Sequence, residues 1–215
     1  MYSRLGSYLK KIESNFENIS QKRKNILIQL NNYLLHKYKN KQTANLIFIC
    51  TENSRRSHFA QIWAATIISH YRLKDINSFS GGTKISELNK RAINVLRKVG
   101  FKITNPTGDN SVYKISFSKK INPLECFSKK YDSSFNPNEN FATIMTCSDA
   151  EKTCPYIPKA EARIFLPYND PKIFDGTNLE EKYYKETCEK IAIEMLFVMK
   201  NIKKGQACLE ENNFK

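Results

Sequence analysis

Asn45-Leu-Ile-Phe-Ile-Cys50 runs without interruption into Thr51-Glu-Asn-Ser-Arg-Arg-Ser57. The first stretch is almost entirely apolar, which is typical of a parallel strand covered on both faces. The second stretch is entirely polar, and residues 58–71 after it have the apolar content of a buried helix. We therefore expect a strand, a loop and a helix in direct succession, with Cys50 at the carboxyl end of the strand.

The remaining pattern extends this unit into a larger α/β fold. Further strands are expected at 76–80 (ended by Gly81-Gly82), 141–146 and 162–166, and further helices at 89–99 (ended by Gly100) and 179–202. Alternation of strands and helices over residues 45–202 predicts a four-stranded parallel sheet with helices on both faces. Ligands of such folds bind beyond the carboxyl ends of the strands, where Cys50 lies.

Three segments fall outside this alternation. Residues 1–44 predict a basic helical extension of two helices, with Ser20 as the N-cap of the second. Residues 111–140 break the pattern and are expected to form an insertion, in which 112–117 and 123–127 pair as a β-hairpin across 119–122. Residues 203–215 are expected to be a flexible tail.

The charge balance is basic, with 35 Lys and Arg against 21 Asp and Glu and a net charge of +14. Residues 1–44 contribute half of this excess, because nine basic residues face two acidic ones there. The excess is consistent with an anionic partner or with a solvated helical face. No nucleic-acid motif accompanies it, so no nucleic-acid partner is expected. No apolar run approaches the roughly 18 residues of a membrane span or resembles a signal peptide, so a cytoplasmic protein is expected.

The loop from Cys50 to Ser57 has the composition of an anion-binding catalytic site. Its backbone N–H groups and the positive end of the following helix can surround one tetrahedral oxyanion. The same field favours the thiolate of Cys50, which is the expected nucleophile. Arg56 can hold two oxygens with its planar guanidinium group, and the Ser57 hydroxyl can donate to the thiolate.

This loop resembles the catalytic loop of the low-molecular-weight tyrosine phosphatase superfamily, which includes the thioredoxin-coupled arsenate reductases. The family pattern is Cys-Thr-Gly-Asn-Ser-Cys-Arg-Ser. The resemblance implies an oxyanion site built from Thr51, Asn53, Ser54, Arg55 and Arg56.

Two residues of the loop depart from the family pattern. Glu52 replaces a glycine and Arg55 replaces a second cysteine. The Glu52 carboxylate is expected either to weaken anion binding or to point outward as a specificity element. The absence of the second loop cysteine removes a redox partner that many phosphatases of the superfamily possess.

A second motif, Thr146-Cys147-Ser-Asp-Ala-Glu-Lys-Thr-Cys154-Pro155, resembles the redox segment of the arsenate reductases. The resemblance implies that Cys50 attacks arsenate, Cys147 attacks the arsenylated Cys50, Cys154 resolves the disulfide and thioredoxin reduces it. On an intact helix these two thiols would be about 10.5 Å apart along the axis, whereas a disulfide needs Cα atoms within about 7 Å. Any helix between them must therefore unwind on oxidation. The alternative is two unpaired cysteines beside a surface loop.

Leu166-Pro-Tyr-Asn-Asp170-Pro171 follows a predicted strand. The superfamily carries an Asp-Pro pair on such a loop, which implies that Asp170 is the general acid for the leaving oxygen. Asp-Pro is also a common turn, and Asp175 is a nearby competitor for the role.

Metal binding has little support in the sequence. There is no Cys-x-x-Cys pair, and His36, His58 and His70 show no ligand spacing with the cysteines, so no metal site is expected. The family resemblance nevertheless allows a potassium ion near Asn53, Ser80 and Asp109. A glutamate that contributes to that ion in the arsenate reductases is a glutamine here, at position 61.

Three functions remain in competition. The first is a thioredoxin-coupled arsenate reductase, and the second is a phosphatase that hydrolyses phosphotyrosine or a small phosphoester through a phosphocysteine at Cys50. Both need Arg56 and Asp170, but only the reductase needs Cys147 and Cys154. The third is a regulatory protein whose basic helices dock on an anionic partner.

Overall fold

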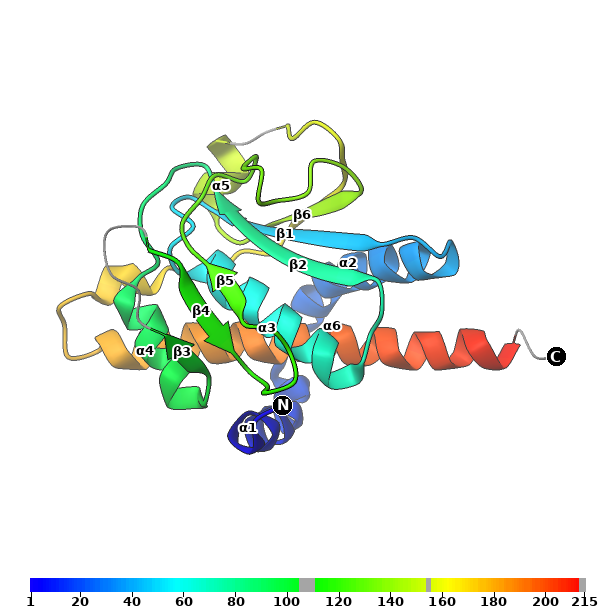
Figure 1. The fold of residues 1–215 in the computed structure, drawn as a ribbon, viewed down its shortest axis with the longest axis horizontal. Coiled ribbons are helices and arrows are strands. Elements are labelled where there is room, and N and C mark those ends of the chain that lie inside the picture. Colours follow the sequence, from blue (N-terminus) through cyan, green and yellow to red (C-terminus); the bar gives the residue numbers. More distant parts are fainter. Residues whose placement is uncertain (105–110, 154–155, 213–215) are drawn as a thin grey trace.

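A four-stranded parallel sheet with the strand order β2-β1-β6-β7 forms the centre of the computed structural model, which describes residues 1–104, 111–153 and 156–212 (Figure 1). Its strands are β1 (Ala44–Cys50), β2 (Ile76–Gly82), β6 (Phe141–Met145) and β7 (Ala160–Phe165). All three pairings are parallel. The predicted α/β fold and its four strands are confirmed.

Strand β1 is covered on both faces, as its apolar sequence predicts. Because side chains alternate along a strand, Leu46 and Phe48 enter one core while Ile47 and Ile49 enter another. Helices α2 (Gln21–Lys39), α3 (Arg56–Tyr71) and α6 (Glu180–Asn212) lie on the first face, and the short α5 (Ser148–Thr153) lies on the second.

The N-terminal residues form the two predicted helices, α1 (Ser3–Glu13) and α2, joined by the 3-10 helix η1 (Ser14–Asn18). Ser20 caps α2 by accepting a hydrogen bond from the backbone N–H of Arg23. Buried leucines of both helices belong to the same apolar core as β1 and α3. The extension therefore packs against the sheet layer and shares its core.

The insertion contains the predicted hairpin, because β4 (Tyr113–Ser116) pairs antiparallel with β5 (Leu124–Cys126). A third strand, β3 (Lys102–Thr104), joins the other edge of β4. Its three residues are too few for a periodic signal in the sequence. Helix α4 (Lys90–Val99) precedes it, with Asn89 as N-cap and Gly100 at a φ of 127° after its end.

Two predicted boundaries are wrong. Strand β2 does not end before the glycine pair but continues to Gly82, and a side chain at Gly81 would collide with the backbone of Tyr131. Residues 203–212 are not a flexible tail, because α6 continues through them to Asn212. Gln206 is buried there, and Gly205 lets α6 approach Leu35 of α2. Despite its 33 residues, neither α6 nor any other helix in the described ranges is apolar enough to cross a membrane.

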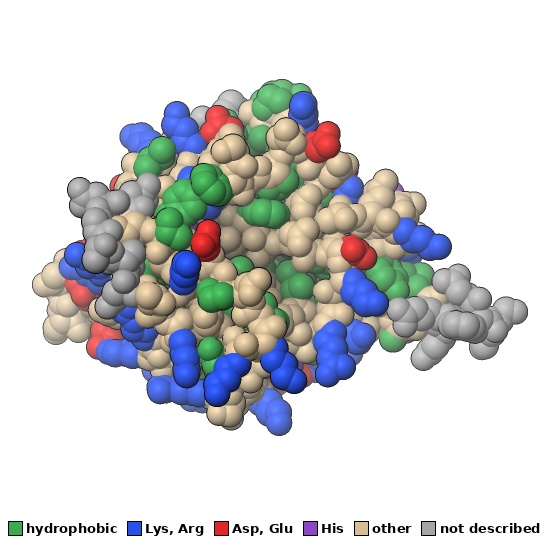
Figure 2. Space-filling view, viewed as in Figure 1, with side chains coloured by type: hydrophobic (Ala, Val, Ile, Leu, Met, Phe, Trp, Pro, Cys, Tyr) green, Lys and Arg blue, Asp and Glu red, His purple; other side chains and the backbone are tan. Residues whose placement is uncertain are grey.

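The excess positive charge is spread over several elements. On the face in Figure 2, Lys and Arg side chains are most frequent along the lower edge, where Figure 1 shows α1 and α4. Two basic residues of α2 form ion pairs with the rest of the fold: the partly buried Arg23 with Glu194, and the buried Lys37 with Glu161. Part of the charge of the extension is therefore already neutralised by acidic residues of this chain.

Candidate active site

The polar loop lies between the carboxyl end of β1 and the first turn of α3. Cys50 is the last residue of β1 and is 3% exposed, and α3 begins at Arg56. The loop opens onto a cavity of about 220 Å³. Its lining consists of Cys50, Thr51, Glu52, Arg55, Arg56, Asp149, Asp170 and Lys172. Five of the expected site residues therefore line one cavity: Cys50, Thr51, Arg55, Arg56 and Asp170.

Behind the cavity, buried polar groups support the sulfur of Cys50. The Ser57 hydroxyl is 3.1 Å from Cys50 Sγ, and Asn53 donates from Nδ2 to that hydroxyl at 2.9 Å. Asn53 and Ser57 are fully buried. Asn53 has a φ of 45°, a left-handed conformation that asparagine adopts more readily than most residues. Asn53 therefore shapes the loop through both its backbone and its side chain.

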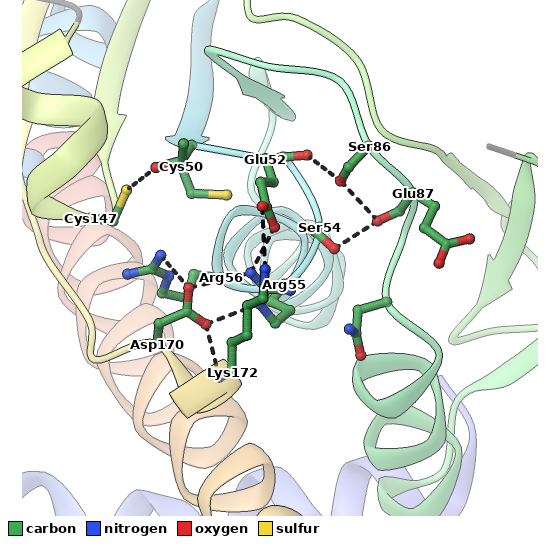
Figure 3. Close-up of polar contacts among 12 residues, drawn as sticks. Cys50, Glu52, Ser54, Arg55, Arg56, Ser86, Glu87, Cys147, Asp170 and Lys172 are labelled. Carbon is green, nitrogen blue, oxygen red and sulfur yellow. Dashed lines mark hydrogen bonds and ion pairs between the residues drawn. The ribbon is translucent and has the colours of Figure 1, made fainter. Parts of the chain in front are cut away.

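Asp170 lies across the cavity from the loop, immediately before the 3-10 helix η2 (Pro171–Phe174). Its carboxylate binds Arg55 Nε at 2.9 Å and Arg56 Nη2 at 2.7 Å (Figure 3). Burial by itself would raise the pKa of Asp170, but Arg56 and Arg55 outweigh it and hold that pKa below its usual value. The aspartate is therefore ionised and bound to the arginines in this structure.

The three guanidinium nitrogens of Arg56 differ in their hydrogen bonds. Its Nη1 donates to the carbonyl of Tyr168 at 3.0 Å and its Nη2 pairs with Asp170. Its Nε is buried and has no hydrogen-bond partner among the residues that the structure describes. Buried donors of this kind are normally satisfied, so Arg56 retains capacity to bind an oxygen of an anion.

The two residues that depart from the family pattern pair with each other. Arg55 Nη2 binds Glu52 Oε2 at 2.9 Å, and Lys172 Nζ lies 3.5 Å from Glu52 Oε1. Burial opposes the ionised form of Glu52, but the bond to Arg55 outweighs it and lowers the pKa of Glu52. Glu52, Arg55, Asp170 and Arg56 therefore form a chain of alternating charges along the cavity (Figure 3).

The thiol of Cys147 reaches the same loop from the other face of the sheet. Its Sγ is 3.4 Å from the Thr51 hydroxyl, and it accepts the backbone N–H of Ala150 at 3.4 Å. Cys147 directly precedes α5 and is 1% exposed. Cys154, its expected partner, lies outside the described residues.

The expected oxyanion-binding residues do not all face the cavity with their side chains. Thr51, Arg55 and Arg56 line it. The Ser54 hydroxyl instead donates to the carbonyl of Glu87 at 2.7 Å, and the Asn53 amide binds Ser57. Any contribution of these two residues to anion binding must therefore come from their backbone N–H groups.

The sequence reasoning missed several residues of the site. Lys172 and Asp149 line the cavity, and Lys172 stands only two positions after Asp170, so its proximity was a usable signal. Ser128 and Lys129 contact the loop from the insertion. Nothing near them in the sequence indicates this, because the contact depends on how the insertion folds back.

The residues present do not fit the potassium ion that the resemblance allowed. Asn53 Oδ1 already accepts the backbone N–H of Lys129, and Gln61 Oε1 accepts the Ser80 hydroxyl at 2.6 Å. Lys129 is buried close to His58. The pKa of His58 is lowered to about 3, first by the burial of His58 and second by the positive charge of Lys129. Asp109, the remaining expected contributor, lies outside the described residues.

Several curated arsenate reductases match more than half of this chain. An arsenate reductase of Staphylococcus aureus (strain bovine RF122) is 31% identical over 126 residues, which cover 59% of this chain and 77% of that protein. The arsenate reductase of Staphylococcus aureus (strain Newman) is 29% identical over the same length and with the same coverage. No protein-family model matches the chain.

Among solved structures, a low-molecular-weight phosphotyrosine phosphatase from Vibrio cholerae O395 aligns with 73% of this chain and 94% of its own. It has a TM-score of 0.49 and 15% sequence identity.

Proposed function

This chain belongs to the superfamily of low-molecular-weight tyrosine phosphatases and arsenate reductases, and we propose that it reduces arsenate with Cys50 as nucleophile. The observation that carries the proposal is the buried thiol of Cys147, which contacts Thr51 of the catalytic loop at 3.4 Å. A phosphatase needs no second thiol at this place, whereas a reductase needs one that supplies electrons to arsenic by attacking the sulfur of Cys50. The curated relatives are arsenate reductases, which supports the same choice.

In the first step, the Cys50 thiolate attacks the arsenic atom while Arg56 and the loop N–H groups hold the oxygens. One As–O bond breaks, and Asp170 protonates the oxygen so that it leaves as water. Asp170 must carry a proton for this step. An arsenate that replaces it on Arg56 leaves it beside a negative charge, which raises the pKa of Asp170 toward a protonated state.

In the second step, the Cys147 thiolate attacks the sulfur of Cys50. The electron pair of the S–As bond passes to arsenic, so As(V) becomes As(III) and leaves as arsenite, and a Cys50–Cys147 disulfide forms. Cys147 is placed for this attack because its sulfur lies 3.4 Å from the Thr51 hydroxyl of the loop and accepts the backbone N–H of Ala150.

In the third step, Cys154 attacks Cys147 and frees the thiol of Cys50. The new Cys147–Cys154 disulfide is the two-electron oxidised form of these thiols, and thioredoxin reduces it. Residues 148–153 must unwind for this step, and Ser148, Asp149 and Thr153 are weak enough helix formers to allow it.

The test is a coupled assay with arsenate, thioredoxin, thioredoxin reductase and NADPH. We expect NADPH oxidation by the wild type and its loss in Cys147→Ser and in Cys154→Ser. Cys208→Ser is the matched control, since this exposed cysteine lies outside both motifs and its loss should leave the rate unchanged. Full activity without Cys147 would reject the relay.

The alternative is a phosphatase that acts through a phosphocysteine at Cys50. It is favoured by the assembly of Cys50, Arg56 and Asp170 around one cavity, which suits phosphate as well as the near-isosteric arsenate. Para-nitrophenyl phosphate distinguishes the two functions in the same variants. Phosphatase turnover that survives in Cys147→Ser, together with no arsenate reduction by the wild type, would establish the alternative.

A further inference from the structure

The segment that follows β5 passes directly beside the catalytic loop. It is held at the end of β2, because Gly82 donates its N–H to the carbonyl of Lys129 at 2.9 Å and accepts the N–H of Tyr131 at 3.0 Å. A side chain at Gly82 would lie 2.8 Å from the backbone of Thr51 and of Asn53. Because residue 82 is glycine, the end of β2 can lie between the loop and the inserted segment and contact the backbone of both.

Ser128 of this segment binds the backbone of the loop. Its hydroxyl donates to the carbonyl of Glu52 at 2.8 Å and accepts the N–H of Ser86, also at 2.8 Å. The Ser86 hydroxyl donates to the same carbonyl at 3.1 Å. Figure 3 shows this carbonyl directed toward Ser86 and away from the Cys50 sulfur. Since a trans peptide carries its C=O and N–H on opposite sides, the N–H of Asn53 is turned the other way.

Lys129, the next residue, fixes the side-chain amide of Asn53. Its backbone N–H donates to Asn53 Oδ1 at 3.0 Å. A backbone N–H can only donate, so the oxygen of the amide faces Lys129 and the NH₂ group faces Ser57. The amide has only one orientation that satisfies both neighbours.

This orientation sets the direction of the next hydrogen bond. Asn53 Nδ2 can only donate, so it takes a lone pair of the Ser57 oxygen. The hydroxyl proton of Ser57 is then free to point at Cys50 Sγ, 3.1 Å away. If the amide were reversed, Ser57 would have to donate to Asn53, and the sulfur would lose its donor.

We infer that the inserted segment at Ser128 and Lys129 positions the catalytic loop, by directing the hydroxyl proton of Ser57 toward Cys50 and so favouring its thiolate. Ser128 and Lys129 are positioning residues and do not line the cavity. Ser128 holds the peptide between Glu52 and Asn53, and Lys129 holds the side-chain amide of Asn53 that contacts Ser57. Their burial, with 1% and 6% exposure, keeps water from replacing these contacts. The inference rests on the proposed role of Cys50 as nucleophile.

The test measures the rate at which iodoacetamide alkylates Cys50 as a function of pH, with the site identified by peptide mass. Lys129→Pro removes the backbone N–H, and Lys129→Ala is the matched control that loses the same side chain but keeps the N–H. We expect the midpoint of the pH profile to be about one pH unit higher in the proline variant than in the alanine variant, which is about tenfold less thiolate at low pH. Ser128→Ala should also raise the midpoint, and Ser128→Thr should restore it.

A double-mutant comparison separates this role from general support of the fold. In a Ser57→Ala background the proline and alanine variants should have the same midpoint, because the donor to the sulfur is absent from both. A difference that persists without Ser57, or equal midpoints when Ser57 is present, would overturn the inference. If Lys129→Pro does not fold, the Ser128→Ala and Ser128→Thr pair decides: equal midpoints in the two variants would also overturn it.

The alkylation assay needs no oxyanion and no thioredoxin, so its outcome is independent of the proposed reaction. A shifted midpoint in a protein that does not reduce arsenate would reject the reductase and keep the positioning role. An active reductase with unshifted midpoints would do the reverse.

Discussion

Arg55 gives the cavity its resting charge arrangement. It stands where the family pattern has a cysteine, and it joins two carboxylates, Glu52 and Asp170, with bonds of 2.9 Å each. Asp170 also forms an ion pair with Arg56, the residue expected to bind the oxyanion. An anion that binds both Nε and Nη2 of Arg56 therefore displaces the Asp170 carboxylate from Nη2. This competition connects substrate binding with the protonation of the proposed general acid.

Asp170→Asn separates binding from catalysis. The amide lacks the charge that competes for Arg56, so binding of inorganic phosphate should tighten by about three- to tenfold, or about 1 kcal/mol. The amide also cannot donate a proton to a leaving oxygen in the way an acid does, so turnover should fall by about a hundredfold or more. Phosphate inhibition constants and single-turnover rates measure the two effects. Unchanged turnover would remove Asp170 from the mechanism.

Glu52→Gln tests whether the loop carboxylate weakens anion binding. Its side chain is 34% exposed and is paired with Arg55, so solvent screens its charge and the effect should be small. We expect the dissociation constant for arsenate or phosphate to fall by about twofold at low salt, and the difference to shrink as salt rises. Titration at two ionic strengths checks this. Weaker binding in the variant would instead indicate that Glu52 mainly holds Arg55 in place.

Among the elements, α2 is joined to α6 by an ion pair, and the same arginine also contacts the segment that leads to the candidate active site. Arg23 binds both carboxylate oxygens of Glu194 at 2.8 Å, and Glu194 is 3% exposed. The guanidinium group of Arg23 also lies 4.7 Å from the ring of Tyr168, whose carbonyl accepts from Arg56. We propose that residues 1–44 are an integral part of the catalytic fold, because this contact runs from the extension to the loop before Asp170.

Glu194→Ala should lower the free energy of unfolding by about 3 kcal/mol, because it leaves the charge of Arg23, whose side chain is only 13% exposed, without its carboxylate partner. The double variant Arg23→Met, Glu194→Leu is the control, since it replaces both charges with apolar groups and should lose much less. Urea unfolding followed by the fluorescence of Trp63 measures both. Trp63 is a suitable probe because it is fully buried and stacks on Tyr8 of α1. A loss that is equal in the two variants would argue against a role for the ion pair.

At the scale of the whole molecule, His58 connects the loop to the stability of the fold. It is fully buried behind the loop, and burial, followed by the ammonium of Lys129, lowers its pKa from 6.5 to about 3. A histidine whose pKa is lower in the folded state contributes stability above the pKa of the unfolded chain. That contribution decreases as the pH falls from about 6.5 toward 3, because the unfolded state takes up the proton first.

The expected loss of stability from His58 between about pH 7.5 and about pH 5 is about 2 kcal/mol. His58→Gln keeps a hydrogen-bonding side chain but has no proton to gain, so this part of the loss should be absent from the variant. Urea unfolding of both proteins at the two pH values isolates the contribution of His58 to the free energy of unfolding, because the carboxylates titrate alike in both proteins. An equal loss in the two proteins would show that other groups cause it.

The sequence was most informative where one local segment carries the whole signal. The apolar run before Cys50, the polar loop and the apolar segment after it predicted a strand that ends at Cys50, a loop and a helix, and β1 and α3 confirm that arrangement. The hairpin of the insertion was also predictable, because its two strands are close in sequence. Strand β3 was not, since three residues carry no period.

Hydrophobic period and residue order are local properties, so they were sufficient to predict the fold class and the loop after β1. Which charged groups meet could be seen only in the folded chain. Arg55 and Asp170 are 115 positions apart, and Lys129 lies 76 positions from Asn53. Such contacts depend on how β2 and the insertion bring distant segments to the same edge of the sheet. Hydrogen-bond direction and charge pairing act over a few ångströms, so the resting state of the loop could be learned only from the folded chain.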